Sequence, residues 1–499
     1  MTPVHGNRFF RYLCGELGKS MKRYDIIVIG GGAAGLMAAA GASGEGRKVA
    51  VLEKMSRPGR KIMITGKGRC NFTNVKAWNE FSQHIHPKPN FLKPSFYNLN
   101  SEKMIDFLNE NGMESVVERG DRAFPASHLA TDVVDALVCA AENAGAEILC
   151  NKAVESVISS YSSDVISSEV ERSFTLKCSD GSTYSCSKLI ICTGGLSYPK
   201  TGSTGDGYKW ATELGHTIRP LFPSLTAIVP NSYKDISSAD RPMIPLTPSH
   251  SSSGSLPLPG GGKMSIPSFS LSSSIKGHID RSTPLSDFGN LLYGNQLKNV
   301  GLSVIIDGNE AANEFGDLDF TDGGIEGPIG FKVSRKVVSA IINGSKVTAF
   351  IDLKPAVDID DLNKRIISLW DEICKDKRNV SKQYKDKFKV LLTKVMPMSL
   401  IPAFTKANPN ADHKTLAKAL KKWKFEISGY VGYERCVITA GGVNCEELAQ
   451  KTLESRLTPG LYFAGEILDL DADTGGYNLQ TAFSTGFLAG LSAAKSLVK

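Results

Sequence analysis

The chain has 499 residues, too many for one hydrophobic core, so two or three domains are expected. Hydrophobic residues make up 41% of the chain and charged residues 22%, which is typical of a globular enzyme. The formal charge of +7 permits an anionic ligand or an RNA partner, but the basic residues look dispersed. A solvated basic surface is therefore preferred to a nucleic-acid footprint, and a small-molecule substrate is the expected partner.

The ten cysteines contain no CxxC pair and no zinc-like spacing with histidine. Several of them lie in apolar, strand-like runs such as "LIICTGG" (189–195). This pattern predicts buried thiols in a reducing compartment, with no disulfide framework and no metal site.

Residues 26–42 are uncharged and follow Lys22 and Arg23, as the apolar part of a signal peptide would. However, four glycines fall among residues 30–35, and a bilayer span needs roughly 20 apolar residues. We therefore expect no membrane or secretory segment, and a cytoplasmic protein. Residues 1–23 are expected to be a leader that is disordered or serves targeting. Its basic residues leave a mitochondrial or plastid presequence as the alternative.

The first recognisable elements form a strand–helix–strand unit. Residues 24–32 ("YDIIVIGGG") predict a buried strand, residues 33–43 a tightly packed helix, and residues 48–54 ("KVAVLEK") a second apolar strand. Continuous apolar strands are what a parallel sheet covered on both faces requires. An amphipathic helix over 129–144, stopped by Gly145, leads to a strand at 146–150. Asp180-Gly181 predicts an antiparallel hairpin that returns to the sheet.

The pattern changes near residue 222. Residues 225–353 contain strand-like runs and no convincing helix, whereas residues 358–424 show helical periodicity and dense lysine. Residues 241–286 are mostly Ser, Pro and Gly, which predicts a flexible insertion. We expect an α/β domain in two parts (24–222 and 429–499), interrupted by a β domain (223–353) and a small helical domain (354–428). A last helix is expected over 477–498.

The motif Gly30-x-Gly32-x-x-Gly35 opens a predicted helix directly after a buried strand, and Glu53 closes the next strand. Glycines in this arrangement permit a tight turn and let N–H groups of the helix start, including those of Ala33 and Ala34, reach a pyrophosphate. Glu53 would accept hydrogen bonds from a ribose hydroxyl. The motif therefore predicts an ADP-containing dinucleotide, FAD or NAD.

Two further stretches favour FAD. The basic segment after the second strand continues towards the pyrophosphate and flavin in FAD enzymes with a glutathione-reductase-like fold, and "LIICTGG" matches their second glycine-rich strand end. The residues that we assign to the cofactor from these stretches and from neighbouring strand ends are Lys54, Arg60, Lys61, Gly68, Arg69, Cys70, Asn71, Val154, Thr193, Gly194 and Gly195.

The C-terminal stretch "GLYFAGEILDLDADTGGYNLQTAFSTGFLAG" (460–490) predicts a strand, an acidic loop and a helix that begins after two glycines. Free N–H groups and the positive dipole end of such a helix stabilise an anionic reduced flavin. The assigned residues are Gly465, Glu466, Asp469, Gly476, Tyr477, Asn478 and Leu479. Whether Glu466 or Asp469 holds the ribityl chain stays open. Ala482, Gly486 and Gly490 fit a helix packed closely against the sheet.

Together these stretches resemble the YhiN/BaiN-like FAD-dependent oxidoreductases. The matching motifs are "GRKIMITGKGRCNFTN" (59–74), "TGGLSYPKTGSTGDGY" (193–208), a divergent "FTDGGIEGPIG" (320–330), "VITAGGV" (437–443) and the C-terminal "AGEILDLDADTGGYNLQ" (464–480). The resemblance covers roughly residues 24–230 and 290–499. It implies a Rossmann-like FAD-binding domain of the two-dinucleotide-binding flavoprotein class, interrupted by a β-barrel-like domain and a small helical domain. Lys67 departs from the glycine that relatives often carry.

Several single residues have two interpretations. A Cys70 thiolate beside Arg69, Lys67 and Lys61 could be a redox partner of a flavin, but a structural or cofactor-contacting thiol is preferred because no CxxC partner exists. Asp206 is either catalytic or orders its glycine turn. Tyr198 and Tyr477 face the flavin or only pack. His84, His86 and His216 look isolated and receive no role, so no catalytic residue is assigned.

The sequence thus predicts an FAD-dependent oxidoreductase. NAD(P)H is expected to reduce the flavin transiently, and an organic compound, such as one with an activated C=C bond, to accept the electrons. Two alternatives stay open: an FAD-dependent RNA-modifying protein, and a flavin-binding regulatory protein without turnover.

Overall fold

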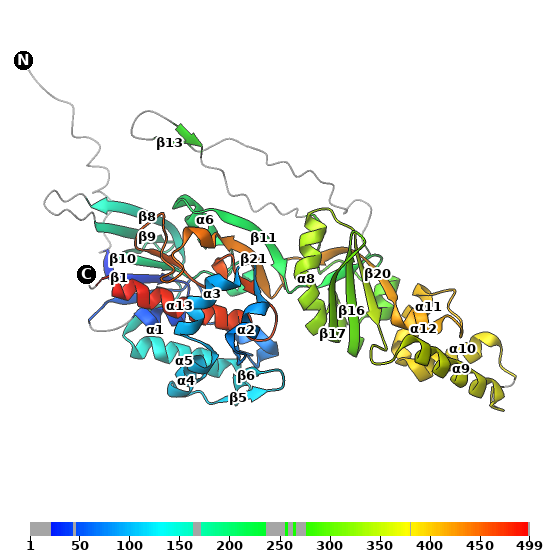
Figure 1. Cartoon of the computed structure of the whole chain (residues 1–499). Helices are drawn as coiled ribbons and strands as arrows, with labels where there is room; N and C mark the ends of the chain where they lie inside the picture. The colour runs from blue at the N-terminus through cyan, green and yellow to red at the C-terminus, as the bar shows by residue number, and fades with distance from the viewer. Residues whose placement is uncertain are drawn as a thin grey trace, which may run out of the picture. The chain divides into compact units, whose positions relative to one another are not determined.

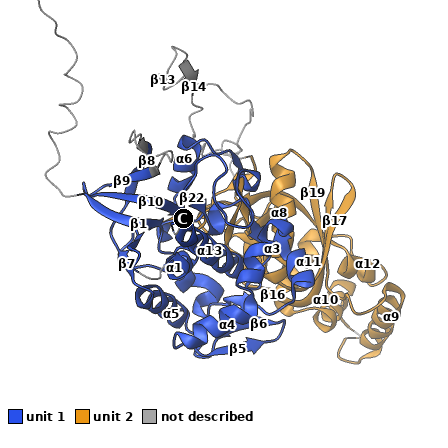
Figure 2. Ribbon diagram, turned by 60° about the vertical axis from the view of Figure 1, so that its left-hand side comes forward, with its two compact units in different colours: residues 1–196, 200–220, 441–499 blue, residues 197–199, 221–440 orange. Residues whose placement is uncertain are grey.

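The computed structural model describes residues 21–42, 46–162, 171–235, 255–257, 263–265, 276–379 and 381–497. The chain divides into two compact units, coloured separately in Figure 2. Unit 1 contains residues 1–196, 200–220 and 441–499, and unit 2 contains residues 197–199 and 221–440. The chain enters unit 2 within β11 (Ile218–Ser224) and returns to unit 1 within β21 (Ile438–Val443).

Unit 1 is built on a parallel sheet with an antiparallel extension. Its strand order is β7-β2-β1-β10-β9-β8, and β22 also pairs with β10. β7, β2, β1, β10 and β22 run parallel, whereas β9 and β8 form the predicted hairpin next to β10. The strands are β1 (Lys22–Ile29), β2 (Val49–Leu52), β7 (Ala146–Leu149), β8 (Val154–Ser162), β9 (Glu171–Cys178), β10 (Thr183–Ile191) and β22 (Leu461–Phe463).

Helices α1 (Ala33–Ala42), α5 (Ala130–Asn143) and α13 (Tyr477–Lys495) cover this sheet (Figure 1). Helix α13 packs backbone to backbone on α1, because a Cβ at Gly486 would lie 2.1 Å from Ala34 O and one at Gly490 would lie 2.0 Å from Ala38 O. The expectation that these glycines face the sheet was therefore wrong: they face a neighbouring helix.

Short elements surround this core. They are η1 (Ile62–Gly68), β3 (Thr73–Asn74), α2 (Trp78–Phe81), η2 (Ser82–His84), β4 (Ile85–His86), α3 (Pro89–Asn98), α4 (Ser101–Glu110), β5 (Ser115–Glu118), β6 (Arg122–Pro125), α6 (Asp206–Glu213), η5 (Cys445–Glu447), η6 (Gly465–Ile467) and β23 (Asp471–Ala472). A further turn, η3 (Pro199–Thr201), lies where the chain passes between the units.

Unit 2 contains a closed antiparallel barrel. Its six strands follow the order β12-β18-β17-β16-β19-β20, and β12 also pairs with β20, which closes the ring. They are β12 (Ile228–Pro230), β16 (Gln296–Ile306), β17 (Asn309–Thr321), β18 (Gly324–Glu326), β19 (Val347–Asp352) and β20 (Trp423–Val431). The predicted β-barrel-like insertion is confirmed. A further strand, β15 (His278–Ile279), pairs parallel with β20.

Two helices inside this region were missed, the short α7 (Asp287–Leu292) and the longer α8. Helix α8 (Gly327–Ile342) buries Ile329, Val333, Val337 and Ile341 along one face. Because Val and Ile favour strands by intrinsic propensity, the segment looked β-like, and packing on the barrel decides its conformation. Most of the expected flexible insertion (241–286) lies outside the described residues, as do leader residues 1–20. The last part of this insertion, residues 276–286, is not flexible, because it contains β15 and because the half-buried Arg281 forms an ion pair with Glu326.

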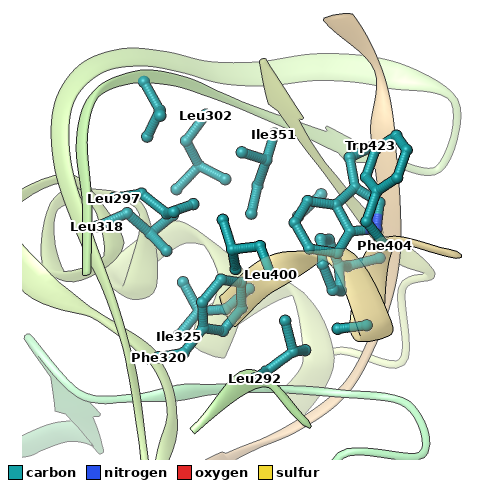
Figure 3. Close-up of a cluster of buried hydrophobic side chains, with 14 of the residues drawn as sticks. Leu292, Leu297, Leu302, Leu318, Phe320, Ile325, Ile351, Leu400, Phe404 and Trp423 are labelled. Atoms are coloured by element: carbon teal, nitrogen blue, oxygen red, sulfur yellow. The ribbon is translucent and has the colours of Figure 1, made fainter. Parts of the chain in front are cut away.

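The remaining elements of unit 2 are mostly helical: β13 (Ser255–Pro257), β14 (Lys263–Ser265), α7 (Asp287–Leu292), α9 (Ile359–Lys375), α10 (Tyr384–Val395), η4 (Met398–Leu400), α11 (Ile401–Ala407) and α12 (Leu416–Lys421). One hydrophobic cluster joins the barrel to these helices, with Trp423 against Phe404 at 5.4 Å and Phe320 at 6.3 Å (Figure 3). The finer division of the chain into four parts stays a prediction.

Candidate functional site: a glycine-lined cradle in unit 1

The glycine turn after β1 has the geometry that the motif predicts. Gly30 has φ +100°, and a Cβ there would lie 2.6 Å from Cys192 O. A Cβ at Gly35 would lie 1.7 Å from Gly30 O, so neither position accepts a side chain. Gly32 differs, because a Cβ built there meets no atom within 4 Å. The turn is thus closely packed on its inner side and open at Gly32, at the start of α1.

Glu53 stands beside this turn, at the end of β2. Its carboxylate is 9% exposed and accepts hydrogen bonds from Gly31 N at 2.7 Å and from Met55 N at 2.8 Å. These bonds fix the carboxylate at the glycine turn, where a ribose hydroxyl of an ADP group would reach it. Val154, also assigned to the site, is buried at the start of β8.

Lys54 contacts the "GSTGDGY" loop. Its Nζ donates to Asp206 Oδ2 at 2.7 Å and to Thr204 Oγ1. Thr204 Oγ1 also donates to Asp206 Oδ2 at 2.9 Å. Asp206 therefore holds its own loop and the end of β2, which favours the structural interpretation of this acid.

The basic segment after β2 folds into η1, and four of the five residues 66–70 at its end have a positive φ. Gly66, Lys67, Gly68 and Cys70 all have φ between +55° and +87°. Lys61 Nζ pairs with Glu466 on η6, so this segment contacts the C-terminal motif. A Cβ at Gly68 would meet nothing within 4 Å, which leaves open space beside the segment. Lys67 is exposed.

Arg69 is held by protein groups. Its guanidinium pairs with Glu118, lies 2.9 Å from His128 Nδ1 and stacks over the Phe124 ring at 4.5 Å. Arg60 is half-buried on the same segment. The assignment of both arginines to the cofactor stays a prediction, and Arg69 would have to leave Glu118 to take it up.

The two most specific motifs meet side by side. Thr73 Oγ1 donates to Gln480 Oε1 at 2.6 Å, and Asn74 Nδ2 donates to Gly475 O at 3.2 Å. A Cβ at Gly476 would lie 2.9 Å from Asn71 Oδ1. This oxygen is buried and has no hydrogen-bond partner among the described residues. Since an unpaired buried acceptor is costly, Asn71 Oδ1 is a position where a ligand donor fits.

Helix α13 begins at this place. Gly475 and Gly476 have φ +128° and +97°, conformations that favour glycine, and the first N–H groups of the helix have no helical acceptor. Asn478 Oδ1 accepts from Ala472 N at 2.9 Å while its Nδ2 donates to Ala472 O at 2.7 Å, so its side chain fixes the preceding loop. Leu479 is half-buried. Backbone groups are therefore what the start of α13 offers an anion.

The strand end before α13 holds the other assigned acids. A Cβ at Gly465 would lie 2.6 Å from the Ala34 side chain, which brings this strand end against the first turn of α1. Glu466 is bound to Lys61, and Asp469 is buried. At the end of β10, Thr193 Oγ1 is another buried hydroxyl without a partner among the described residues, while Gly194 has φ +75° and Gly195 is buried.

Two histidines without an assigned role meet on one carboxylate. His84 Nδ1 lies 2.9 Å from Asp473 Oδ2, and His86 Nε2 lies 3.1 Å from Asp473 Oδ1. The His84 ring stacks on Tyr477, the first residue of α13, with ring centres 4.3 Å apart. Burial alone would raise the pKa of Asp473, but the two histidines outweigh burial and lower it to about 2. The pairing of β4 with β23 creates this cluster, and no local sequence signal indicates that pairing.

Cys70 is 0% exposed, and burial raises the pKa of its thiol to about 12. Arg69 contacts other partners, which favours the interpretation of Cys70 as a structural or cofactor-contacting thiol. Its assignment to the cofactor stays a prediction. Tyr477 is 3% exposed and packs against His84 and Phe81. Tyr198 belongs to unit 2.

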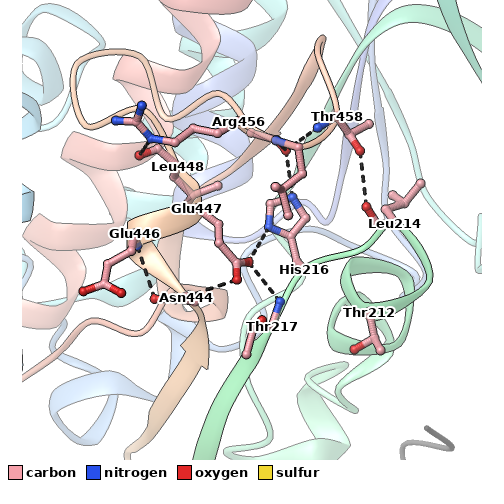
Figure 4. Close-up of polar contacts among 12 residues, drawn as sticks. Thr212, Leu214, His216, Thr217, Asn444, Glu446, Glu447, Leu448, Arg456 and Thr458 are labelled. Atoms are coloured by element: carbon pink, nitrogen blue, oxygen red, sulfur yellow. Dashed lines mark hydrogen bonds and ion pairs between the residues drawn. The ribbon is translucent and has the colours of Figure 1, made fainter. Parts of the chain in front are cut away.

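His216 forms a separate buried network, shown in Figure 4. Its Nδ1 lies 3.1 Å from Glu447 Oε2 and its Nε2 lies 2.8 Å from Ser455 Oγ, while Glu447 also accepts from Thr217 N at 2.9 Å. Burial lowers the pKa of His216, and Glu447 offsets only part of that effect. The imidazole therefore serves as a neutral structural link inside unit 1.

These features fit FAD. Gly32 leaves room at the start of α1, Glu53 stands at the ribose position, and Asn71 presents an orphaned acceptor beside the start of α13. Among the residues that the structure describes, no group of three His, Cys, Asp or Glu side chains could hold a metal ion. Within the same residues, no helix is long and apolar enough to cross a bilayer.

Comparison with known proteins gives a family model and several relatives over almost the whole chain. The model described as "HI0933-like protein Rossmann domain" matches residues 24–492. The ribosomal RNA dihydrouridine synthase of Escherichia coli (strain K12) is 29% identical over 480 residues, which cover 95% of this chain and 100% of the relative. The enzyme of that name from Haemophilus influenzae is 26% identical over 486 residues, covering 95% and 100%. The 3-dehydro-bile acid delta(4,6)-reductase of Clostridium scindens is 26% identical over 487 residues, covering 94% and 99%.

Proposed function

Because the chain belongs to the HI0933-like family of FAD-dependent Rossmann oxidoreductases, we propose that it reduces a C=C bond conjugated to a carbonyl group. We propose the uracil base of RNA as the acceptor and NAD(P)H as the reductant. The observation that carries this proposal is the cradle, which has open space at Gly32 and an unpaired buried acceptor on Asn71 beside the start of α13.

The names of the relatives support this reaction class. Dihydrouridine is uridine in which the C5=C6 bond is saturated, and that bond is conjugated to the C4 carbonyl. A delta(4,6)-reductase is likewise named for carbon–carbon double bonds. All three relatives span nearly the same length as this chain, so the comparison concerns whole proteins and not one shared domain.

We assign the cofactor to the residues of the cradle. Gly30, Gly32 and the first N–H groups of α1 would hold the pyrophosphate, and Glu53 would accept from the adenosine ribose. Asn71 and the first N–H groups of α13 would face the flavin end. When bound, FAD supplies a two-electron carrier that takes hydride from a nicotinamide and passes it to a carbon atom. The sequence contains one dinucleotide fingerprint, so the nicotinamide would visit and leave.

The chain also supplies charge and a proton at this end of the cradle. The positive end of α13 and the Lys61 ammonium favour negative charge there, although Glu466 offsets Lys61. Saturating a C=C bond requires one proton in addition to hydride. Our candidate donor is His84, because Asp473 holds its Nδ1 and the Tyr477 ring fixes its plane. In the imidazolium form Nε2 would carry the transferable proton, and the ring would become neutral when it gives this proton up.

Anaerobic stopped-flow spectroscopy tests the proposal. We expect NADH or NADPH to bleach the bound flavin, and uracil-containing RNA to restore its colour with formation of one dihydrouridine per flavin. Bleached flavin that no uracil or enone reoxidises, but that oxygen does, would contradict the reaction class. If the protein retains FAD but neither NADH nor NADPH bleaches it, the proposal that NAD(P)H is the reductant is contradicted.

A steroid-type dienone is a second candidate acceptor, which the bile acid reductase supports. The same experiment with a 3-oxo-4,6-dienoic bile acid in place of RNA separates the two candidates. Faster reoxidation by the dienone than by RNA at equal concentration would favour the small-molecule acceptor.

A further inference from the structure

We propose that the helices of unit 2 form a docking surface for single-stranded RNA. The surface comprises residues 373–424 together with Trp370, and we refer to it as the basic helical surface. This inference deepens the proposed function, on which its biological meaning rests, because it indicates how an RNA acceptor would be held. RNA binding is measured without turnover, so it succeeds or fails independently of flavin chemistry.

The net positive charge of the protein comes from this segment. Residues 373–424 contain 14 lysines and arginines against three acids, whereas the rest of the chain contains 44 against 48. The expectation that the basic residues are dispersed was therefore wrong, because the rest of the chain contains more acidic than basic residues. Concentration of charge of one sign on one element is the electrostatic footprint of a polyanion partner.

Most of these charges have no acidic partner among the residues that the structure describes. There, ion pairs or hydrogen bonds engage the side chains of Arg378, Lys382, Lys421 and Lys424. Within the described part of the chain no ion pair is formed by the others, which are Lys375, Lys377, Lys385, Lys387, Lys389, Lys394, Lys406, Lys414, Lys418 and Lys422. All of these are exposed except Lys387, which is half-buried. They are therefore available to phosphate groups.

A merely solvated helix would be expected to look different. Such helices carry both signs, with opposite charges four residues apart. The first turn of α9 has this character, since Asp361 pairs with Lys364. Helix α10 instead places Lys385 and Lys389 four residues apart, an arrangement that destabilises a helix slightly on its own. A bound phosphate backbone would remove this repulsion.

Aromatic rings lie among the lysines. Trp370 stacks on His413 with ring centres 4.6 Å apart and planes 9° apart, and the Trp370 and Tyr384 rings are 5.0 Å apart. Tyr384 is 46% exposed, and its hydroxyl lies 3.1 Å from His413 Nδ1. Lys385 and Lys414 follow Tyr384 and His413 in the chain. Trp370 and His413 are half-buried, so Tyr384 is the ring most open to a ligand. An exposed ring beside lysines suits an unpaired base, which stacks on it while phosphates meet the ammonium groups.

Fluorescence anisotropy with the FAD-loaded protein and a labelled single-stranded oligouridine tests the surface. The test variant replaces Lys385, Lys389 and Lys414 by Gln. The matched control replaces Lys48, Lys93 and Lys451, exposed lysines of unit 1 without ion pairs among the described residues. Both variants remove three charges, so they differ only in location.

We expect the test variant to bind RNA at least tenfold more weakly and to lower the slope of log K against log salt by about 2, since each phosphate contact contributes about 0.7. The control should bind within about twofold of the unchanged protein. Equal losses in both variants would show that net charge alone attracts RNA and would overturn the docking surface. So would wild-type binding in the test variant.

A second pair of variants tests the aromatic part. Tyr384→Ala should weaken binding of the single strand several-fold without changing the salt slope, whereas Tyr384→Phe, which keeps the ring, should bind as the unchanged protein does. If Tyr384→Ala binds as tightly as Tyr384→Phe, bases do not stack there. Unchanged flavin content and melting temperature establish that each variant is folded.

Discussion

At the scale of single residues, the candidate site combines a buried polar atom that has no hydrogen-bond partner among the described residues with open space beside the glycine turn. Asn71 Oδ1 is buried and unpaired, and the space beside Gly32 is open, although the surrounding backbone is closely packed. Unpaired buried atoms in a native structure call for an explanation. A bound flavin nucleotide explains both features at once, because it would donate a hydrogen bond to Asn71 and occupy the open end of the turn.

We predict that Asn71→Leu weakens FAD binding without unfolding the protein. An apolar side chain of similar size removes the unpaired oxygen, so the apoprotein should be as stable as before or slightly more stable. FAD should lose an acceptor and bind about tenfold more weakly, which corresponds to about 1.4 kcal/mol. Titration of apoprotein with FAD measures the first effect and urea unfolding the second. Unchanged FAD affinity together with lower stability would instead give Asn71 a structural role.

His84 carries the second prediction. His84→Gln should leave reduction of the flavin by NAD(P)H unchanged, because hydride transfer from nicotinamide requires no proton from this residue. Reoxidation by the acceptor should slow by about 10²-fold or more, the usual contribution of a general acid. Stopped-flow traces of the two half-reactions separate these effects.

His86→Gln is the matched control, because His86 shares Asp473 but does not stack on Tyr477. If both variants slow reoxidation equally, the pair only positions Asp473 and the start of α13, and the proton has another source.

At this scale the sequence predicted what is local. The glycine turn, Glu53 and the start of α13 follow from spacing along a few residues. The His84–Asp473–His86 cluster does not, since its members are almost 390 residues apart and meet only because β4 pairs with β23. The engagement of Arg69 by Glu118 and His128 depends in the same way on a distant hairpin, formed by β5 and β6.

At the scale of elements, unit 1 is held together by backbone contact between α1 and α13. Gly41, Gly486 and Gly490 lack the side chains that would separate these helices, so α13 is fixed against the whole length of α1. The parallel sheet was predicted correctly because its strands are continuously apolar. Helix α8 was missed because its buried face is β-branched, and only the barrel beneath it selects a helix.

We predict that Gly490→Ala destabilises the protein. In an open helical position this change stabilises by about 1 kcal/mol. Here the new methyl group would lie 2.0 Å from Ala38 O, and such overpacking costs about 1–3 kcal/mol. Urea unfolding measures the free energy. Ser492→Ala on the same helix is the control and should stay within about 0.5 kcal/mol. Stabilisation by Gly490→Ala would contradict the close approach of α13 to α1.

The network around His216 makes stability depend on pH. Burial lowers the pKa of His216 in the folded state, so the unfolded chain takes up a proton near pH 6.5 that the folded state refuses. The stability that this neutral histidine contributes is therefore complete above pH 6.5 and is lost as the pH falls below it. His216→Gln should be less stable at pH 8 by about 1–2 kcal/mol, because hydrogen bonds are lost.

Between pH 7 and pH 5, the His216→Gln variant should lose less stability than the unchanged protein, because glutamine does not titrate. Urea unfolding at several pH values measures the slope for both proteins. Parallel slopes would show that another group causes the acid sensitivity.

At the scale of the whole molecule, two distinct parts serve one reaction in this account. Unit 1 contains the glycine-lined cradle that we assign to the flavin nucleotide, and unit 2 combines a closed barrel with helices whose residues 373–424 contain 14 lysines and arginines against three acids. The motifs predicted the family and the inserted barrel. Closure of the barrel could not be predicted, because β12 and β20 are about 200 residues apart in the chain and pair only after the intervening strands have formed. The sequence shows where the lysines are concentrated. Whether acidic side chains neutralise them depends on the fold, and among the described residues most of these lysines form no ion pair.

The most direct test of the central claim is a single turnover with isotopic label. Protein reduced anaerobically with deuterated NAD(P)H is mixed with uracil-containing RNA, and the nucleosides are analysed by mass spectrometry. Gly32→Val serves as the control, because a Cβ at this position would meet no protein atom within 4 Å and the larger side chain would fill the open end of the glycine turn, which should abolish FAD binding while the fold persists. We expect the unchanged protein to form dihydrouridine in an amount equal to its bound flavin, and Gly32→Val to form none. Dihydrouridine formed equally by Gly32→Val, or flavin that stays reduced in the presence of both RNA and a dienone, would contradict it.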